Sequence, residues 1–365
     1  MDDLAAALRK VHPELEAVRA AAREPVYLVG GAVRDLLLGR PRADVDLVVA
    51  GDAAALAARL GGAGVEHERF GTVKAEVEGH EIDIASARTE SYPEPGALPV
   101  VAPAESIEAD LARRDFTINS MAVPLADESQ LIDPFGGRED LEQGLLRVLH
   151  DASFEDDPTR AIRAARYAAR FDFALEPETE ALLRKADLTT VSADRRRAEL
   201  ERLAAEPTAC GGFDLLAEWG LIDLRENGSE LMRLVNDLLD VPHWAEFAPR
   251  ERALMTAALG PPGAEEVLAS MWPPQPGEGV EVAERRDPVE LILARALGAD
   301  WLDHYLTAWS KVELEIDGDD LIAAGVEQGP AIGRGLRAAR HKKLEGQAHG
   351  RDEELATALA AALRD

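Results

Sequence analysis

Residues 27–49 read YLVGGAVRDLLLGRPRADVDLVV, and this stretch decides the fold of the chain around it. Its apolar start predicts a short strand that ends at Gly30 and Gly31. Apolar residues then recur at helical spacing, which predicts a helix. A second strand-like run follows and begins with Asp44 and Asp46. The predicted order is therefore strand, glycine pair, helix, and a strand that carries two aspartates.

This order suits the binding of phosphates and of a divalent cation. Gly30 and Gly31 let the backbone approach a ligand closely, and the N–H groups of the next helical turn favour an anion. Asp44 and Asp46 stand two apart on a strand, so their side chains point to the same side. Such carboxylates repel each other unless a cation lies between them, and oxygen ligands suit Mg²⁺. Taken singly, the glycines could be an ordinary turn and the aspartates a solvated strand face.

The composition is that of a folded protein with more than one domain. The chain has 365 residues, of which 46% are hydrophobic, and this exceeds one ordinary core. No run of eighteen apolar residues occurs, and the N-terminus is charged, so we expect neither a transmembrane span nor a secretory signal. The single cysteine, Cys210, excludes a disulfide framework and fits a reducing cytosol. We therefore expect a cytoplasmic protein.

The net charge raises an objection to a nucleic-acid partner. It is −29 at pH 7, whereas the binding of a phosphate backbone normally needs a basic surface. The objection weakens only if the basic residues cluster. Most of them are arginines, which are the better side chain for bidentate contacts with phosphate.

The first part of the chain predicts a small mixed α/β domain. Residues 1–23 have the pattern of an amphipathic helix. Residues 72–77 and 80–85 alternate in polarity and are joined by Glu78 and Gly79, which predicts a β-hairpin. Asp83 lies on the second strand of this hairpin. It is either a third carboxylate of a metal site or a polar residue of an edge strand.

A proline-rich connector and a charged segment come next. Residues 88–103, which contain SYPEPGALPVVAP, predict a loop or a mobile connector. Residues 113–122 alternate between apolar and polar, which predicts a strand with one buried face. Polar residues of this segment could face a charged ligand, or could form local ion pairs at a strand end: Arg113, Arg114, Asp115 and Asn119.

From about residue 145 the pattern predicts helices almost without interruption. A long helix is expected to open at Ser153, with Pro158 in its first turn and acidic residues that complement the helix dipole. Capping alone would explain Asp157. Capping does not explain four arginines at helical spacing, which repel one another unless an anion lies along them: Arg160, Arg163, Arg166 and Arg170.

Residues 181–365 are predicted to be mainly helical. Breaks are expected at 211–212, at 260–263 and at 273–277, and the last, with the GEGVEVAE that follows, is the best candidate for a flexible connector. Near the end, a helix start at Gly329 is followed by basic residues that form either a phosphate-contacting patch or a solvated helix face. The residues of this patch are Gly333, Arg334, Arg337, Lys342 and Lys343.

Several long motifs stand in a fixed order along the chain: GGAVRDLLLG with DVD, RRDFTINSMA, IDPFGGREDL, DDPTRAIRAARYAARF and GDDLIAAGVEQGPAIG. They resemble the motifs of class II tRNA nucleotidyltransferases, the family of bacterial CCA-adding enzymes and bacterial poly(A) polymerases. The resemblance is dense to about residue 180, sparse in the middle and clear again at the tail. It implies an α+β fold, with a polymerase-β-like nucleotidyltransferase head at 1–145 and an all-α neck at 146–205, body at 206–315 and tail at 316–365.

The resemblance also implies substrates, a cofactor and a role for each matching residue. The substrates would be CTP, ATP and the acceptor half of tRNA, with two Mg²⁺ ions as cofactor. The metal ligands would be Asp44 and Asp46, with Asp83 as a third. The nucleotide would contact Gly30, Gly31, Arg34, Arg113, Arg114, Asp115, Asn119, Asp157, Arg160 and Arg163. The RNA would contact Arg166 and the basic patch near the C-terminus.

Physical chemistry supports the assignment of Asp157 and Arg160 to the incoming base. Cytosine and adenine each present an amino donor beside a ring-nitrogen acceptor, which match a carboxylate and a guanidinium. Uracil and guanine present the opposite order and would leave buried polar groups mismatched. One aspartate and one arginine can therefore choose C and A without a nucleic-acid template. The motif usually begins Glu-Asp in the family, whereas here it begins at Asp156, so its selectivity is open.

Other functions remain to be weighed. Within the family, the chain could add only CC or only A, or could be a poly(A) polymerase, and its proline-rich connector resembles that of relatives that add part of CCA. Outside the family, a glycosyltransferase would use Asp44 and Asp46 for a nucleotide-sugar but leave the arginine helix unexplained. A non-catalytic RNA-binding scaffold would not need both aspartates and both glycines. The sequence does not predict the oligomeric state.

Overall fold

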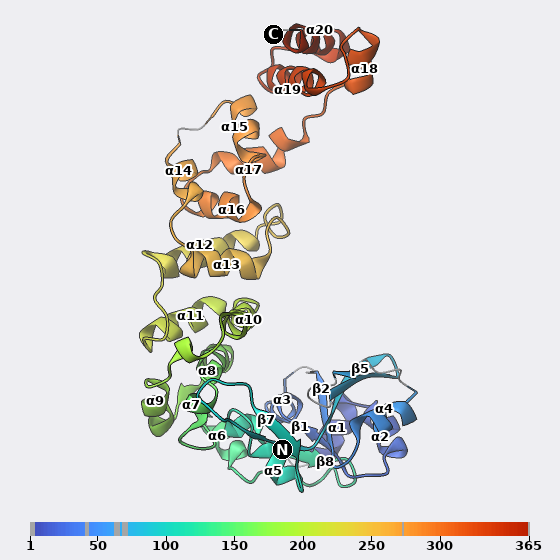
Figure 1. Ribbon diagram of the computed structural model, residues 1–365, viewed down its shortest axis with the longest axis vertical. Helices are drawn as coiled ribbons and strands as arrows, with labels where there is room; N and C mark the ends of the chain where they lie inside the picture. Colours follow the sequence, from blue (N-terminus) through green and yellow to red (C-terminus); the bar gives the residue numbers. More distant parts are fainter. Residues whose placement is uncertain (1–3, 41–43, 62–65, 68–71, 272–273, 364–365) are drawn as a thin grey trace. The chain divides into compact units, whose positions relative to one another are not determined.

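The computed structural model describes the whole chain except residues 1–3, 41–43, 62–65, 68–71, 272–273 and 364–365. The chain forms two compact units, Met1–Ile222 and Asp223–Asp365. The first unit combines a mixed sheet with helices, and the second is helical throughout its described residues (Figure 1). Among the described residues, no helix combines the length and the apolar character that crossing a membrane requires.

A six-stranded sheet forms the centre of the first unit. Its strand order is β3-β4-β5-β2-β1-β8, in which β2 and β5 run parallel and the other neighbours are antiparallel. Its strands are β1 (Val26–Val29), β2 (Val45–Val49), β3 (Glu66–His67), β4 (Thr72–Val77), β5 (His80–Ser86) and β8 (Ala122–Pro124). The predicted hairpin is confirmed as β4 and β5, and the buried residues of β4 alternate with exposed ones, as expected for a strand with one covered face.

Two pairs of short strands lie outside this sheet. They are the antiparallel pair β6 (Arg88–Ser91) and β7 (Val100–Pro103), and the parallel pair β9 (Leu145–Leu146) and β10 (Ala174–Leu175). The loop or connector expected at 88–103 was therefore wrong at both ends, which form β6 and β7, and only its centre, 92–99, is the tip of a hairpin. Its flanking residues extend because they pair with each other, which the loop-forming prolines at its centre conceal.

The helices of the first unit pack against the sheet and then against one another. They are α1 (Leu4–Val11), α2 (Leu15–Ala21), α3 (Gly31–Leu37), α4 (Ala53–Arg59), α5 (Ile107–Leu111), α6 (Gly137–Gln143), α7 (Ser153–Asp156), α8 (Thr159–Phe171), α9 (Pro177–Leu183), α10 (Ala193–Ala204) and α11 (Ala209–Glu218), with 3₁₀ turns at Thr117–Asn119 and Leu188–Thr190. Helix α8 packs on α10 and α11 with the small side chains Ala161, Ala164, Ala165 and Ala168 buried. The arginines of α8 lie on the other face of the helix.

The second unit is a succession of packed helices. They are α12 (Gly228–Leu239), α13 (Arg250–Leu259), α14 (Ala264–Ser270), α15 (Pro276–Ala283), α16 (Pro288–Ala296), α17 (Trp301–Thr307), α18 (Gly318–Ala323), α19 (Pro330–Leu344) and α20 (Gly350–Ala362), with a 3₁₀ turn at Trp309–Lys311. Helices α19 and α20 lie side by side (Figure 1) and share a small core with α18 that includes Leu321, Ala339 and Ala358. The predicted helix start at Gly329 is confirmed, with Gly329 as the residue that precedes α19.

Prolines divide two of the predicted helices. The expected helix at 1–23 is two helices, α1 and α2, with Pro13 between them. The long helix expected to open at Ser153 is also two, because Asp157 is extended, with φ −136° and ψ 91°, and α8 begins only after Pro158. A residue that precedes proline is pushed out of the helical region, so the prediction of one continuous helix was wrong in both places.

Two predicted interruptions are helical in the structure. The glycines at 211–212 lie inside α11, and Gly212 contacts Leu203 of α10 so closely that a side chain on it would collide. These glycines permit close packing of two helices and do not end one. The expected connector after 273–277 forms helix α15, which has Pro276 in its first turn, a favourable position. The first residue of that connector, 273, lies outside the described residues.

Candidate active site

The glycine pair after β1 serves two different purposes. Gly30 has φ +66°, and a Cβ atom on it would lie 2.7 Å from Nη1 of Arg114, so the fold itself requires glycine there. Gly31 begins α3, and a Cβ on it would meet only Nη2 of Arg34, at an ordinary 3.5 Å. The protein itself would therefore accept a side chain at Gly31. A side chain at Gly31 would instead obstruct the cleft beside this residue.

Asp46 of β2 and Asp83 of β5 are register partners in this parallel pair, so their side chains lie next to each other on the same side of the sheet. Burial raises the pKa of Asp46 to about 6, and the carboxylates of Asp83 and Asp44 add to the rise, while Arg114 and Arg34 oppose it. Oδ1 of Asp83 is buried and accepts no hydrogen bond, and Nζ of Lys74 lies 3.5 Å from it. Two neighbouring carboxylates, one of them with a raised pKa, thus line the cleft.

This acidic pair has the chemistry of a site for a divalent cation. Carboxylate oxygens are the ligands that Mg²⁺ prefers, and a cation would lower the pKa of Asp46 and satisfy Oδ1 of Asp83. Asp44 lies just before β2 and is exposed, and it is not among the residues that line the cleft. Within the described part of the chain, no three histidine, cysteine or carboxylate side chains converge closely enough to hold a metal as they stand.

A series of hydrogen bonds connects Arg34, in the helix that follows the glycine pair, to helix α8. Arg34 is 4% exposed and donates from Nη1 to Oδ1 of Asn119 at 2.6 Å. Asn119 donates to Oδ1 of Asp115 at 2.9 Å, and Arg163 of α8 donates to Oδ2 of Asp115 at 2.8 Å. Burial pushes the pKa of Asp115 upward, but Arg163 and Asn119 outweigh burial and bring the pKa down to about 2. Asp115 is therefore a fixed anion that orders the polar groups on both sides of it.

Asp110 is a buried carboxylate that pairs with two arginines of the cleft, and it was not among the predicted site residues. It is fully buried, and its Oδ1 accepts from Nε and Nη2 of Arg113 at 3.0 Å, while its Oδ2 accepts from Nη2 of Arg114 at 3.2 Å. The available signal was the spacing of three and four residues between Asp110, in α5, and two arginines that follow the end of this helix. Burial lowers the pKa of Arg114, and Asp110 counteracts that effect.

The expected strand at 113–122 was wrong. Residues 117–119 form a 3₁₀ turn, and both apolar and polar side chains there are buried, including Thr117, Asn119 and Ser120. The polar ones are buried because they have partners: Thr117 donates to Asp140 at 2.6 Å, and Ser120 donates to the carbonyl of Phe116 at 3.0 Å. Alternating polarity in this segment reflects hydrogen-bonded burial and not two faces of a strand.

Asp157 and Arg160 lie where α7 ends and α8 begins. Oδ1 of Asp157 accepts from the amide of Thr159 at 3.1 Å and from its hydroxyl at 2.6 Å, so the capping role is real. Arg160 is 4% exposed and donates to Oγ of Ser153 at 2.7 Å and to the carbonyl of Arg113 at 2.9 Å. Both side chains also line the cleft. The same two side chains thus make local contacts at the start of α8 and line the cleft.

The other arginines of α8 are only partly neutralised by the protein. Arg163 is paired with Asp115, which raises the pKa of Arg163 despite its burial. Arg170 lies 3.5 Å from Glu206 and 3.9 Å from Asp35. Nε of Arg166 is buried without a hydrogen bond. The series therefore keeps positive charge on the face that borders the cleft, as expected if an anion binds there.

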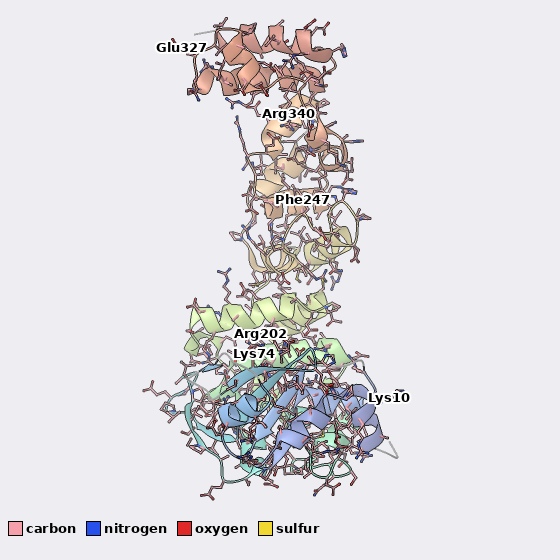
Figure 2. All side chains as sticks on the ribbon, turned by 90° about the vertical axis from the view of Figure 1, so that its right-hand side faces the viewer. Lys10, Lys74, Arg202, Phe247, Glu327 and Arg340 are labelled. Atoms are coloured by element: carbon pink, nitrogen blue, oxygen red, sulfur yellow. The ribbon has the colours of Figure 1, made fainter. Side chains whose placement is uncertain are left out.

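A single cleft of about 600 Å³ brings most of the predicted site together. The predicted residues that line it are Gly30, Gly31, Arg34, Asp46, Asp83, Arg113, Arg114, Asp115, Asn119, Asp157, Arg160, Arg163 and Arg166. Residues that line it and were not predicted include Glu90, Tyr92, Arg195, Glu199 and Arg202. Arg202, labelled in Figure 2, is more than half exposed and pairs with Glu199.

The basic residues of α19 belong to the second unit and differ among themselves. Nζ of Lys343 lies 2.6 Å from the buried Glu354, and Arg334 donates weakly to the carbonyl of Ala362 at 3.5 Å. Arg337 and Lys342 are exposed. Among the described residues Arg337 has no hydrogen-bond or ion-pair partner, and Lys342 contacts only Gln347. Of the predicted patch, these two residues are therefore available to a ligand.

The combination of an acidic sheet edge, a glycine turn and an arginine helix defines a nucleotidyltransferase of the polymerase-β type. Residues 26–147 match the family model of the poly A polymerase head domain. The chain is 36% identical to the CC-adding tRNA nucleotidyltransferase of Deinococcus radiodurans, over 94% of this chain and 91% of that protein. The chain belongs to the tRNA nucleotidyltransferase family, and this membership removes the glycosyltransferase alternative.

Other relatives match over part of their length. The A-adding tRNA nucleotidyltransferase of Halalkalibacterium halodurans is 42% identical over 252 residues, which are 63% of this chain and 59% of that protein. The A-adding enzyme of Aquifex aeolicus is 49% identical over 166 residues, but the match spans only 20% of it. The chain thus spans between one fifth and three fifths of the length of these two curated relatives.

Solved structures match along the whole chain. A CCA-adding enzyme without ligand superposes with a TM-score of 0.81 and 30% identity, over 98% of both chains. The Thermotoga maritima CCA-adding enzyme complexed with tRNA superposes with a TM-score of 0.76 and 29% identity, again over 98% of both chains. The predicted fold, a nucleotidyltransferase head followed by helices, is confirmed.

Proposed function

We propose that this protein adds the nucleotides C, C and A to the 3′ end of tRNA, using CTP and ATP and no nucleic-acid template. The observation that carries the proposal is that one cleft holds the glycine pair, the acidic pair and the Asp157–Arg160 pair. The cleft can then bind the phosphates, the reacting hydroxyl and the base at the same time. Solved CCA-adding enzymes in complex with ATP, with CTP and with tRNA match this chain at 29% identity, which supports the same substrates here.

In this proposal the glycine pair and Arg34 hold the triphosphate. The Arg34 guanidinium donates one hydrogen bond to Asp35 and one to Asn119, and within the described residues its other N–H groups make no further hydrogen bond, which leaves them for phosphate oxygens. It also lies over the rings of Phe171 and Tyr167, at 4.6 and 5.3 Å from their centres. Such stacking fixes its plane, and a fixed donor is more effective than a mobile one when charge develops on phosphate.

Asp157 and Arg160 choose the base in this proposal. Arg160 uses two of its five N–H groups on Ser153 and Arg113, which leaves donors for the ring nitrogen of cytosine or adenine. Oδ1 of Asp157 is occupied, so Oδ2 is left to accept from the amino group of the base. Uracil would place a carbonyl against that oxygen. The mismatch of buried polar groups costs about 1–3 kcal/mol, which is enough for strong discrimination.

Asp46 and Asp83, with Asp44 beside them, are the residues that would hold Mg²⁺. Bound there, Mg²⁺ would supply charge stabilisation for the attacking 3′ oxygen and for the departing pyrophosphate. The carboxylates themselves position the acceptor terminus, because β2 and β5 are buried and fix them in register. Arg114, held by Asp110, lies between this pair and Gly30 and contributes a fixed positive charge near the phosphates.

The remaining assignments extend the proposal to RNA. Residues 1–145 would form the catalytic head, 146–205 the neck that carries the selecting pair, 206–315 the body and 316–365 the tail. Arg166 would contact the acceptor end, and the exposed cations of the patch on α19, namely Arg334, Arg337 and Lys342, would contact the tRNA backbone, whereas Lys343 is held by Glu354. We expect the enzyme to work in the cytoplasm, where its three substrates occur together.

Addition of A alone is the second candidate. The relatives named as A-adding enzymes are 42% and 49% identical in the region that contains the cleft, and one full-length relative is a CC-adding enzyme. Both alternatives use the same site, because the Asp–Arg pair fits C and A equally well. The number of additions is therefore a question separate from the chemistry.

Purified protein incubated with tRNA transcripts that end before CCA, after C or after CC tests the proposal. Each transcript receives CTP alone, ATP alone or both, and the 3′ ends are sequenced. A CCA-adding enzyme completes all three transcripts with both nucleotides and then stops. An A-adding enzyme extends only the transcript that ends in CC, and a poly(A) polymerase continues past A. No extension of any transcript would refute the proposal.

A further inference from the structure

The orientation of the Asp157 carboxylate depends on a residue from another helix. Two of the three donors to Oδ1 are local and come from Thr159. The third is Nη2 of Arg195, at 3.0 Å, from α10. Oδ2 receives no hydrogen bond from any part of the chain that the structure describes. One oxygen is thus saturated, and the other is left for a ligand.

Arg195 is itself fixed at its other end. Its Nη1 donates to the carbonyl of Gly96 at 2.7 Å. The amide of Gly96 lies 3.2 Å from the carbonyl of Glu155 in α7, and the φ of Gly96 is +71°. A Cβ on Gly96 would lie 2.7 Å from the carbonyl oxygen of Thr190, so the backbone there is tightly packed. The guanidinium therefore links the fixed carbonyl of Gly96 to the carboxylate of Asp157.

The consequence concerns rotation of the carboxylate. The terminal torsion of an aspartate is broad, and a carboxylate held by one neighbour alone can turn and exchange its oxygens. Thr159 follows Asp157 by two residues and would move with it. Arg195 belongs to a separate helix and holds the carboxylate relative to the cleft. A planar guanidinium with two parallel donors is well suited to this, whereas a lysine has no such fork.

We infer that Arg195 is a positioning residue for base selection: it holds the Asp157 carboxylate so that Oδ2 faces the amino group of the incoming base. The inference rests on the proposed function of the same cleft. Arg195 is one-quarter exposed and lines that cleft, so its role is not confined to the core. It acts through Asp157 and needs no contact with the base.

The inference predicts a change in selectivity and not only in rate. In Arg195→Ala, the carboxylate would be free to turn, and the ratio of kcat/KM for CTP to that for UTP should fall by about tenfold to a hundredfold. The ratio of CTP to GTP should fall as well. Arg195→Lys keeps the charge but loses the fork, so it should restore only part of the ratio.

A matched control is available on the same helix. Arg197 is 73% exposed and pairs with Glu201, away from the cleft. Arg197→Ala should leave both ratios within about twofold of wild type. Thr159→Val, which removes the 2.6 Å hydroxyl donor to Oδ1, should lower the ratios in the same direction. Combined with Arg195→Ala, its effect should not be additive, because both donors act on one oxygen.

The measurements are single-nucleotide addition kinetics with CTP, ATP, UTP and GTP, together with thermal unfolding and tRNA binding for each variant. Unchanged ratios in Arg195→Ala, or equal losses for all four nucleotides, would overturn the inference. If Arg195→Ala does not fold, the ratio in Arg195→Lys decides the matter in the same way. Failure of the wild-type protein to add any nucleotide would instead refute the proposed function, so the two failures are distinguishable.

Discussion

The cleft of the first unit and helix α19 of the second both gather cations, but they hold them differently. In the cleft, Arg34, Arg114 and Arg163 each donate to a buried acceptor. On α19, Arg337 and Lys342 are exposed and make little contact with the described protein. Choosing a base requires donors at fixed positions, whereas binding a phosphate backbone requires mainly charge. The difference in constraint matches the difference in proposed task.

Helix α19 also carries a cation, Arg340, that several protein acceptors hold in place. Arg340, labelled in Figure 2, donates to Glu284 and to the carbonyls of Ser310 and Val312, at 2.6, 3.1 and 3.2 Å. It joins α19 to the preceding helices and is unavailable to RNA. Basic residues on one helix therefore divide into structural and exposed ones, which a count of charges along the sequence does not separate.

The largest effect is expected at the acidic pair. Asp46→Asn should lower nucleotide transfer by about a thousandfold or more, because it removes a charge that the reaction needs close to the phosphates. Binding of tRNA should stay within about twofold, since the exposed cations are unchanged. The exposed Asp127 supplies the control variant Asp127→Asn, which should transfer normally. Equal activity of the two variants would point to a non-catalytic, RNA-binding scaffold.

Substitutions at Gly30 and Gly31 should have different effects, one on the stability of the protein and the other on its kinetics. Gly31→Ala should fold normally, because its Cβ meets only a contact of 3.5 Å, but it should raise the KM for CTP about tenfold to a hundredfold by obstructing the triphosphate. Gly30→Ala should instead destabilise the protein by about 1–3 kcal/mol, through its φ of +66° and the collision with Arg114. Urea unfolding and steady-state kinetics measure the two effects. A stability loss in Gly31→Ala of the same size would contradict the distinction.

The raised pKa of Asp46 predicts a dependence of stability on pH in the absence of metal. Its folded pKa of about 6 exceeds the ordinary value of 3.8, so its contribution to stability is full below that ordinary value and is lost as the pH rises through 6. At pH 7 Asp46→Asn should therefore be more stable than wild type by about 1–2 kcal/mol. The difference should vanish near pH 4. Added Mg²⁺ should stabilise wild type at pH 7 and leave Asp46→Asn unchanged.

Asp115 should show the opposite dependence of stability on pH, because its pKa is lowered and not raised. Its folded pKa of about 2 lies below 3.8, so it stabilises the protein above that ordinary value, and this stability is lost as the pH falls toward 2. Asp115→Asn should be less stable than wild type at pH 7. Urea titrations of Asp46→Asn at pH 4 and pH 7, and of Asp115→Asn at pH 7 and near pH 2, check the signs, and the same pH trend in both would contradict the assignments.

The smallest effect is expected on α19. The double variant Arg337→Ala and Lys342→Ala should weaken tRNA binding about threefold to tenfold and reduce the salt slope of binding by about two, with kcat unchanged. Lys343→Ala is the matched contrast, because it leaves the buried Glu354 without its 2.6 Å partner and should lower stability. Filter binding at several salt concentrations gives the slopes. A slope unchanged in the double variant would remove these residues from the RNA contact.

Much of the site was predictable because its signals are local. The strand before Gly30, the hairpin that carries Asp83 and the arginine face of α8 each depend on spacing within a few residues. The errors arose where a distant partner changed the meaning of a residue. The segment around Asn119 was taken for a strand because its buried polar groups could not be known to have partners, and Gly212 was taken for a break because its neighbour Leu203 was unknown.

The sequence by itself determined the order of the elements, the family and the residues that could carry charge to a phosphate or a base. Only the tertiary structure decided which of those charges are free. Asp157 is oriented by Arg195, 38 positions away, and Arg195 in turn by Gly96, 99 positions away. Periodicity acts over a few residues, whereas the partners of a buried charge are fixed by packing between elements far apart in the chain.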